Sequence, residues 1–420
     1  MAEIIDHLYS KFLSSSGVSI DTRTLQESNL FFAISGPNFN ANTFASQALQ
    51  KGATWAVVDD AQFAINDRCI LVEDGLKALQ GLAKRHRNEF SIPILGITGS
   101  NGKTTTKELI SNVLSKKYMV HATKGNYNNH IGVPLTLLQM QPDTEIAIVE
   151  MGANHVGEIA SYCQVANPTH GLITNIGRAH TETFGGIEGV IRGKSELFDF
   201  LRKTEGIPII NMNDKVLSNM SKRFVNPIQY PAASLYLLET SPFLHIKLGD
   251  QTSGTHLVGK YNYNNIAAAV AIGQLFEVSN SDILAAIGEY DPDNARSQII
   301  KKGTTTIILD AYNANPDSMR VALESLAEQS GKTMAILGDM NELENPDEAH
   351  LEILDYAKEL GIKLVLTLGE KIGSVSKGPH HFGDKEKLAD FLGSMDLSES
   401  TVLLKASRSI KLETIVNSIH

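Results

Sequence analysis

The fold is decided by the stretch IPILGITGSNGKTTTKELISNVLSKK, residues 92–117. Its apolar start predicts a buried strand, and its second half predicts a helix. In the turn between them, Gly99 and Gly102 let the backbone curl so that several N–H groups point at a phosphate. Lys103 adds a point charge, and Thr104 offers a hydroxyl to magnesium at the start of the helix. The stretch therefore predicts a phosphate-binding loop.

The spacing of this loop is a variant of the P-loop. A strict P-loop has glycine at the position of Ile97, so the motif here is TGxNGKT. Such a turn could simply join a strand to a helix, but the lysine and the threonines in this context favour nucleotide binding. The predicted nucleotide contacts in the loop are Gly99, Ser100, Asn101, Gly102, Lys103, Thr104 and Thr105. A P-loop fixes only ATP or GTP, so the reaction must be inferred from the rest of the chain.

Outward from this loop, apolar runs alternate with helical stretches. IAIV (146–149), LIT (172–174) and IPII (207–210) predict further strands of a parallel sheet covered on both faces. The turn-rich segment EYDPDNARS ends this region, and the runs TIILD, TMAILGD, KLVLTLG and TVLLK predict a doubly wound, Rossmann-like domain after it. We therefore expect an α/β protein of three domains. Their predicted bounds are residues 1–91, 92–292 and 293–420.

Composition and charge are those of a globular protein. The 420 residues are 42% hydrophobic and 20% charged, and 37 basic against 47 acidic residues give a net charge of −10. This acidic balance argues against nucleic-acid binding, and no stretch approaches the roughly 18 apolar residues of a membrane span. Cys69 and Cys163 are too few for a disulfide framework. We expect a cytoplasmic monomer that acts on small molecules, without stable membrane insertion.

Further segments resemble landmarks of the Mur ligases, the ATP-dependent amide-bond-forming enzymes of peptidoglycan precursor synthesis. In chain order they are TGSNGKT, GNYNNHIGVP (125–134), VEMGANHVGEI (149–159), AHTETFGGIEGVIRGK (179–194), GKYNYNNIAAAVA (259–271), DAYNANPDSM (310–319) and KASR (405–408). The resemblance covers nearly the whole chain. It implies a three-domain Mur ligase architecture, with a central P-loop ATPase domain. DAYNANPDSM and GDMNEL (338–343) resemble the members that add D-alanyl-D-alanine to UDP-N-acetylmuramoyl-tripeptide.

The resemblance also implies a reaction. The terminal carboxylate of the tripeptide would take the γ-phosphoryl group of ATP and become an acyl phosphate. The amine of D-alanyl-D-alanine would then displace phosphate, giving the pentapeptide, ADP and phosphate. Because no enzyme nucleophile is required, positioning and charge neutralisation carry the catalysis. The first domain would hold the UDP-sugar, the central domain ATP, and the last domain the dipeptide.

Four residues are the implied Mg²⁺ ligands: Thr104, Glu150, His180 and Lys194, the last as a carbamate formed from carbon dioxide. Glu150 closes the strand IAIVE at the sheet edge where ligands collect, but it could also be an exposed strand-end glutamate. Lys194 could instead contact phosphate directly or face solvent. The implied catalytic residues are Lys103, His180, Lys194 and Arg296.

Further contacts follow from the resemblance for all three substrates. For ATP they are Asn126, Asn262 and Asn265, with Arg296 at the γ-phosphate and Asp310 at the ribose. For the dipeptide they are Asn313, Asn315, Pro316, Lys405, Ser407 and Arg408. For the UDP-sugar they are Asp21, Thr22 and Arg23. Simpler alternatives stay open: Asn262 or Asn265 could cap the next helix, Arg408 could flank the final helix, and Asp21 to Arg23 could form a turn. Tyr261 stands where the family has histidine.

Two other functions remain open. Another Mur-type or folylpolyglutamate-synthase-like ligase would use the same chemistry, although DAYNANPDSM and the long first domain argue against it. A P-loop kinase or regulatory NTPase would bind ATP without needing the dipeptide. ADP formation that depends on D-alanyl-D-alanine separates these functions.

Overall fold

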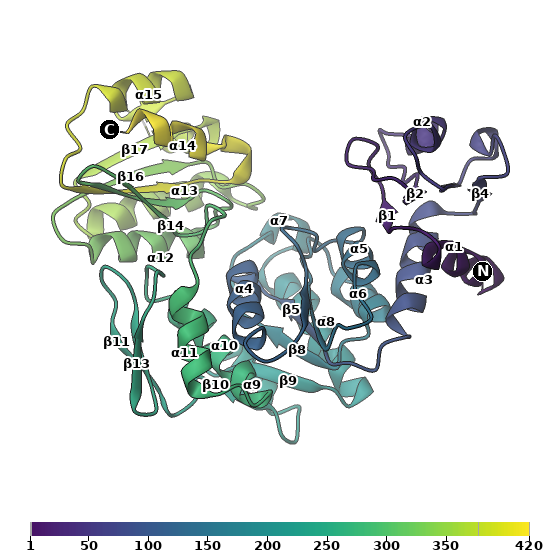
Figure 1. Ribbon diagram of the computed structural model, residues 1–420. Coiled ribbons are helices and arrows are strands. Elements are labelled where there is room, and N and C mark those ends of the chain that lie inside the picture. The colour runs from purple at the N-terminus through teal and green to yellow at the C-terminus, as the bar shows by residue number, and fades with distance from the viewer. Residues whose placement is uncertain (1, 377, 420) are drawn as a thin grey trace.

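The computed structural model describes residues 2–376 and 378–419. They form three α/β units in chain order, and the central unit lies between the other two (Figure 1). Parallel sheets in each unit confirm the predicted fold class. The predicted bounds fall between α3 and β5 and between α11 and β14, and they stay predictions. Among the described helices, none is both long and apolar enough to cross a membrane.

The first unit contains a parallel sheet in the order β1-β2-β3-β4. Its elements are α1 (Ala2–Leu13), β1 (Val18–Ser19), β2 (Leu30–Phe32), α2 (Ala45–Gln50), β3 (Trp55–Val58), β4 (Cys69–Leu71) and α3 (Gly75–Arg87). Helices α1 and α3 cover one face of the sheet, and α2 covers the other. Leu79 and Leu82 of α3 share a buried cluster with Leu137 and Leu138 of the central unit. An apolar joint therefore connects these two units.

The central unit is a six-stranded parallel sheet in the order β10-β9-β8-β5-β7-β6. Its strands are β5 (Ile94–Thr98), β6 (Val120–Ala122), β7 (Ile146–Glu150), β8 (His170–Ile173), β9 (Ile207–Asn211) and β10 (Ile228–Tyr230). Its helices are α4 (Lys103–Leu114), α5 (Gly132–Leu138), α6 (Glu158–Ala166), α7 (Thr181–Phe184), α8 (Ile187–Thr204), α9 (Lys215–Ser221), α10 (Asn262–Leu275) and α11 (Asn280–Glu289).

Strand β7 explains why the central strands are continuous apolar runs in the sequence. Ile146 and Ile148 belong to the cluster that contains α4 and α10, whereas Ala147 and Val149 belong to the cluster that contains α6 and α8. Alternate side chains thus enter different cores, and both faces must be apolar. The chain places β6 and β7 on one side of β5 and β8 to β10 on the other. The P-loop follows β5 and therefore lies at the topological switch point.

A small antiparallel sheet was not predicted from the sequence. It consists of β11 (Leu235–Glu239), β12 (His245–Leu248) and β13 (Gln251–Gly254). Only one face is buried: Leu235, Ile246 and Leu248 enter the core that contains α10. Strands β12 and β13 therefore lack the continuous apolar runs that identified the central strands, whereas β11 is an apolar run with Tyr236 and Leu238 exposed.

The last unit is a six-stranded sheet in the order β14-β15-β19-β16-β17-β18, in which β14 alone is antiparallel to its neighbour. Its strands are β14 (Gln298–Lys302), β15 (Thr305–Asp310), β16 (Lys332–Gly338), β17 (Leu364–Leu368), β18 (His381–Phe382) and β19 (Ser400–Lys405). Its helices are α12 (Pro316–Ala327), α13 (Pro346–Glu359), α14 (Glu370–Val375) and α15 (Lys385–Gly393). Asp310 and Lys405 are direct neighbours across β15 and β19.

Candidate active site

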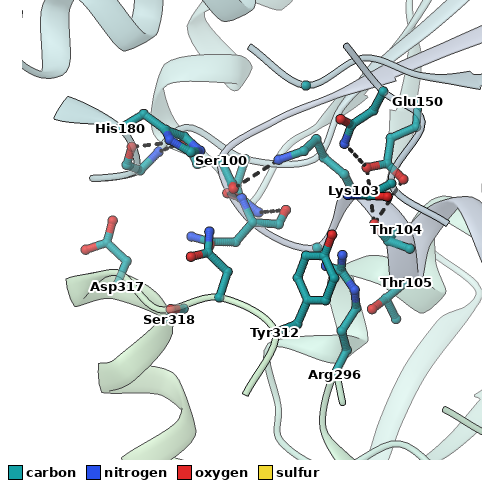
Figure 2. Close-up of a pocket in the computed structure, with 18 of the residues that line it drawn as sticks. Ser100, Lys103, Thr104, Thr105, Glu150, His180, Arg296, Tyr312, Asp317 and Ser318 are labelled. Carbon is teal, nitrogen blue, oxygen red and sulfur yellow. Dashed lines mark hydrogen bonds between the residues drawn. The ribbon is translucent and has the colours of Figure 1, made fainter. Parts of the chain in front are cut away.

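The P-loop opens into a cleft of about 610 Å³ between the central and last units. Lys103 and Thr104 lie with Glu150 on one side, and Arg296 and Tyr312 reach towards them from the other (Figure 2). The predicted site residues that line the cleft are Ser100, Asn101, Gly102, Lys103, Thr104, Thr105, Asn126, Glu150, His180, Asn262, Asn265, Arg296, Asp310, Asn313 and Lys405.

The loop conformation depends on its two glycines. Gly99 and Gly102 have φ values of +143° and +77°, which favour glycine. A Cβ on Gly99 would lie 2.0 Å from Thr174 Oγ1. Lys103 Nζ donates to the carbonyl of Gly99 at 2.8 Å and to that of Ser100 at 3.3 Å. Burial lowers the pKa of Lys103.

The segment after β8 supports this loop, a role that the sequence analysis missed. The backbone N–H of Asn101 donates to Asn175 Oδ1 at 3.0 Å, and Thr174 Oγ1 donates to the backbone carbonyl of Asn101 at 2.6 Å. Ser100 Oγ donates to the Gly177 carbonyl at 3.0 Å. The signal was available, because residues 174–177 directly follow a strand beside β5 and must reach the same sheet edge.

Glu150 lies under the start of α4 and is 1% exposed, so the alternative of an exposed strand-end glutamate is wrong. Its carboxylate accepts from Thr104 Oγ1 at 3.0 Å and from Asn128 Nδ2 at 2.8 Å. Asn128 was not predicted, although it lies two residues after Asn126. A hydroxyl beside a carboxylate suits Mg²⁺. The described residues contain no group of three or more His, Cys, Asp or Glu placed to hold a metal ion, so phosphate oxygens and water would have to complete the shell.

Lys194 is fully buried, so the alternative that it faces solvent is wrong. Its Nζ donates to the Ala153 carbonyl at 3.1 Å and lies 5.2 Å from the centre of the Phe184 ring. Burial holds the pKa of Lys194 well below its ordinary value, and the charge of Lys103 lowers it further. An amine in this environment favours its neutral form.

His180 lies at the edge of the cleft and contacts the last unit. Its Nδ1 is 2.5 Å from Glu342 Oε2. The hydrogen-bonding contact with His180 lowers the pKa of Glu342. Glu342 belongs to the GDMNEL segment, so that segment reaches the central unit at this histidine.

Asn101 and Asn315 connect the central and last units beside the cleft. Asn315 Nδ2 donates to Asn101 Oδ1 at 2.7 Å, and Asn101 Nδ2 returns a longer bond of 3.5 Å. Asn315 Oδ1 also accepts from the Ser318 N–H at 2.9 Å and caps α12, whose first residue is Pro316. Asn315 is 4% exposed. The P-loop and the DAYNANPDSM segment are therefore in direct contact.

Arg178 makes a second bridge that the sequence analysis missed. Its backbone N–H and its Nε donate to Asp317 at 2.6 and 3.0 Å, and its Nη1 and Nη2 donate to Glu352 at 3.0 and 3.1 Å. The hydrogen bonds to Glu352 and Asp317 raise the pKa of Arg178. Its place between Asn175 and His180 was the available signal.

Asn262 and Asn265 lie beneath the P-loop helix. Thr106 Oγ1 donates to Asn265 Oδ1 at 3.0 Å, Asn265 Nδ2 donates to Asn262 Oδ1 at 2.8 Å, and Asn262 Nδ2 donates to the Val258 carbonyl at 2.8 Å. The capping alternative is wrong, because Tyr261 occupies the N-cap of α10 without a side-chain hydrogen bond. These amides brace α10 against α4, and their adenine contact stays a prediction.

The last unit places Arg296, Asp310 and Lys405 on the opposite wall. The guanidinium carbon of Arg296 lies 3.6 Å from the centre of the Tyr312 ring. Lys405 Nζ donates to Asp310 Oδ2 at 2.5 Å and to the Asn313 carbonyl at 3.3 Å. Their roles towards ribose and dipeptide stay predictions.

Several predicted residues do not line this cleft: Gly99, Lys194, Asn315, Pro316, Ser407, Arg408, Asp21, Thr22 and Arg23. Ser407 is buried and accepts from the Asn341 N–H at 3.0 Å, and Arg408 is exposed beside Glu413. Asp21 forms a turn with Arg23 on the first unit, and this pairing lowers the pKa of Asp21 to about 2.

Comparisons with known proteins agree with this geometry. Residues 97–273 match the Mur ligase middle domain, and residues 295–408 match the Mur ligase glutamate ligase domain. The UDP-N-acetylmuramoyl-tripeptide--D-alanyl-D-alanine ligase of Bacillus subtilis is 36% identical, over 96% of this chain and 93% of the relative. The Escherichia coli enzyme of that name is 32% identical, over 97% and 94%.

Two crystal structures are similar over the full length. MurF from Acinetobacter baumannii has a TM-score of 0.86 at 27% identity and covers 98% of both chains. MurF from Thermotoga maritima, in complex with ADP, has a TM-score of 0.85 at 28% identity and covers 97% of both chains. This chain belongs to the Mur ligase family and groups with its MurF members.

Proposed function

We propose that the chain joins D-alanyl-D-alanine to UDP-N-acetylmuramoyl-tripeptide, using ATP, in peptidoglycan precursor synthesis. The observation that carries this function is the contact of Asn101 with Asn315, which places a phosphate-binding loop against the DAYNANPDSM segment in one cleft. The full-length likeness to ligases of that name supports it. The UDP-sugar would bind the first unit near Asp21 to Arg23, and the dipeptide would bind the last.

The P-loop residues would help to bring two anions together, the tripeptide carboxylate and the γ-phosphate of ATP. Lys103 would move from the loop carbonyls of Gly99 and Ser100 to the β- and γ-phosphates of ATP, where its charge is neutralised. Thr104 and Glu150 would hold Mg²⁺, which supplies positive charge at the phosphate oxygens. Arg296 would approach the γ-phosphate from the facing wall.

Chemistry then proceeds in two displacements. An oxygen of the tripeptide carboxylate forms a bond to the γ-phosphorus while the bond to ADP breaks, giving an acyl phosphate. The dipeptide amine then forms the amide bond, and phosphate leaves with the C–O bond electrons; the amine loses its proton. The amides of Asn313 and Asn315 and the cations Lys405 and Arg408 are the proposed groups for the dipeptide.

Lys194 would act as a carbamate. A neutral amine adds to carbon dioxide and loses a proton, which converts the neutral side chain into an anion. Burial beside Phe184 and the charge of Lys103 both favour the neutral amine that this step needs. The carbamate and His180 would complete the second Mg²⁺ site. We further infer a monomer in the cytoplasm, where ATP and UDP-sugars are made.

One assay tests the function. The purified protein is given ATP, Mg²⁺ and UDP-N-acetylmuramoyl-tripeptide, with and without D-alanyl-D-alanine, and ADP is measured. We expect ADP formation that depends on the dipeptide and equals the pentapeptide formed. ADP formation without the dipeptide would refute the assignment and favour an NTPase of another class. No ADP formation with the authentic tripeptide and the dipeptide would refute the assignment as well.

A further inference from the structure

Glu108 connects the P-loop helix to the segment that joins the central and last units. Tyr290 Oη donates to Glu108 Oε2 at 2.7 Å, and Asn294 Nδ2 lies 3.1 Å from both carboxylate oxygens. Glu108 lies five residues after Lys103 on α4, which is about 7.5 Å along the helix axis. Burial and the Glu108 charge raise the pKa of Tyr290, so the phenol stays a hydrogen-bond donor at neutral pH. One rigid helix thus holds both the phosphate lysine and this segment.

The same segment carries Arg296 in an unusual backbone turn. Ala295 and Ser297 on either side of it have φ values of +55° and +57°. Left-handed conformations are strained for non-glycine residues and persist where surrounding contacts hold them. Beyond the arginine, the Ser297 N–H donates to Asp310 Oδ1 at 3.3 Å, and Ser297 Oγ lies 2.5 Å from Tyr261 Oη. Before it, Glu108 holds Asn294.

Arg296 itself has a free donor. Its Nε is buried and has no hydrogen-bond partner among the described residues, while its guanidinium lies over the Tyr312 ring. In Figure 2 the side chain extends towards the P-loop. Lys103 and Arg296 line the same cleft from opposite walls, so the turn decides where the second cation lies relative to the P-loop lysine.

We propose that Glu108 is a positioning residue, which fixes residues 290–297 to α4 and thereby aims Arg296 at the transferred phosphoryl group. This inference rests on the proposed function for its kinetic part. Glu108 touches no substrate in this scheme; it acts through Arg296. Losing it lets the turn relax, and a misplaced cation stabilises the transition state poorly.

A double-mutant cycle tests this coupling. We expect Glu108→Ala to lower kcat at least about tenfold, with KM for the UDP-tripeptide changed less than about twofold. In an Arg296→Ala background, the same change should lower kcat less than about twofold, because its effect passes through the arginine. Glu108→Gln keeps an acceptor oxygen for Tyr290 and should recover most of the loss.

The chain offers a matched control. Glu289, the last residue of α11, pairs with Lys116 just beyond α4 at 2.6 Å and is exposed. Glu289→Ala removes a carboxylate that links the end of α11 to the segment after α4. This carboxylate does not hold the turn that carries Arg296, so kcat should stay unchanged. Melting temperatures of all variants separate misfolding from mispositioning.

Hydrogen exchange gives a readout that needs no ligase activity. Amides of residues 293–297 should exchange at least about tenfold faster in Glu108→Ala than in the parent or in Glu289→Ala, with α4 unchanged. Unchanged exchange, or a Glu108→Ala effect on kcat that is equally large in the Arg296→Ala background, would overturn the proposal. A parent protein without dipeptide-dependent ADP formation would refute the proposed function instead, and the exchange rates would still decide whether Glu108 holds the turn.

Discussion

Arg178 offers the sharpest test of how the last unit is held over the P-loop. Its guanidinium crosses the cleft to Asp317 at the start of α12 and to Glu352 on α13. Replacing it by methionine removes both ion pairs and keeps much of the side-chain volume. The backbone hydrogen bond from residue 178 to Asp317 survives the substitution. The change therefore isolates the charge that links the units.

The free energy lost with the two ion pairs of Arg178 can be estimated from the solvent exposure of the three side chains. The Arg178 side chain is 40% exposed, and those of Asp317 and Glu352 are 36% and 29% exposed. At this exposure solvent screens the charges, and each pair contributes about 0.5 kcal/mol. Two pairs give about 1 kcal/mol, which corresponds to about a fivefold shift of the equilibrium towards the open arrangement. Because the dipeptide site needs the last unit in place, we expect KM for D-alanyl-D-alanine to rise by up to about that factor.

Arg320 supplies the matched control. It pairs with the same Glu352 at 2.8 Å but lies on α12, within the last unit. Arg320→Met therefore removes a Glu352 ion pair without touching the link between units, and KM should stay unchanged. In the parent, added salt should raise KM for the dipeptide, whereas Arg178→Met should have lost most of this salt dependence. An unchanged KM together with an unchanged salt dependence in Arg178→Met would show that the Arg178 ion pairs do not hold the last unit over the P-loop.

Three further outcomes follow from the site. Gly99→Ala should abolish ATP binding in a nucleotide titration, because the φ of +143° and the 2.0 Å approach to Thr174 Oγ1 leave no room for a Cβ; parent affinity would contradict this. Glu150→Gln should raise the Mg²⁺ concentration for half-maximal ADP formation by about tenfold, since a neutral amide is a poorer ligand; an unchanged Mg²⁺ titration excludes a role in metal binding. Lys194→Arg keeps the cation but cannot form a carbamate, and it should lose at least about 100-fold in kcat together with any ¹³C-carbamate NMR signal. Full activity in the Lys194→Arg variant would refute the carbamate proposal. The lowered pKa also means that Lys194 supplies neutral amine for carbon dioxide at a lower pH than an ordinary lysine does.

The fold could be predicted where local patterns were strong. Continuous apolar runs predicted strands such as β7, because both faces of this strand are buried. The glycines of the P-loop predicted the turn after β5. The small sheet of β11 to β13 was not predicted, because β12 and β13 are buried on one face only and lack apolar runs, and the apolar run of β11 had no recognisable partner strand beside it. Contacts between residues distant in sequence were also not predicted. Nothing in the letters around Glu108 indicates that Tyr290 will reach it, because that contact depends on how α11 packs on α4.

The candidate site shows the same division. Lys103 and Thr104 were predicted from the glycine-rich turn between β5 and α4, and Glu150, which ends β7 at the carboxyl edge of the sheet, from the resemblance to the family. Arg178 was missed: its place in the chain put it near the cleft, but its two acidic partners lie far along the chain and could not be inferred from the sequence around it. Asn315 was predicted for the dipeptide, and the structure adds a cap and a contact to the P-loop that spacing could not show.

The two joints of the molecule are built from different chemistry, and this difference bears on which unit moves. Between the first and central units, Leu79 and Leu82 pack into one core with Leu137 and Leu138, so separating the units would expose apolar surface to water. Across the cleft, the last unit is held by polar and charged contacts that water can replace. Its apolar contacts with the central unit include Val258, which is buried in the last unit's core, and Phe243, which packs against that core. We infer that this apolar pivot and these polar contacts would let the last unit hinge over the P-loop while the first unit stays fixed. Substrates held on the first and central units would thus keep their alignment while the last unit opens to admit the amine.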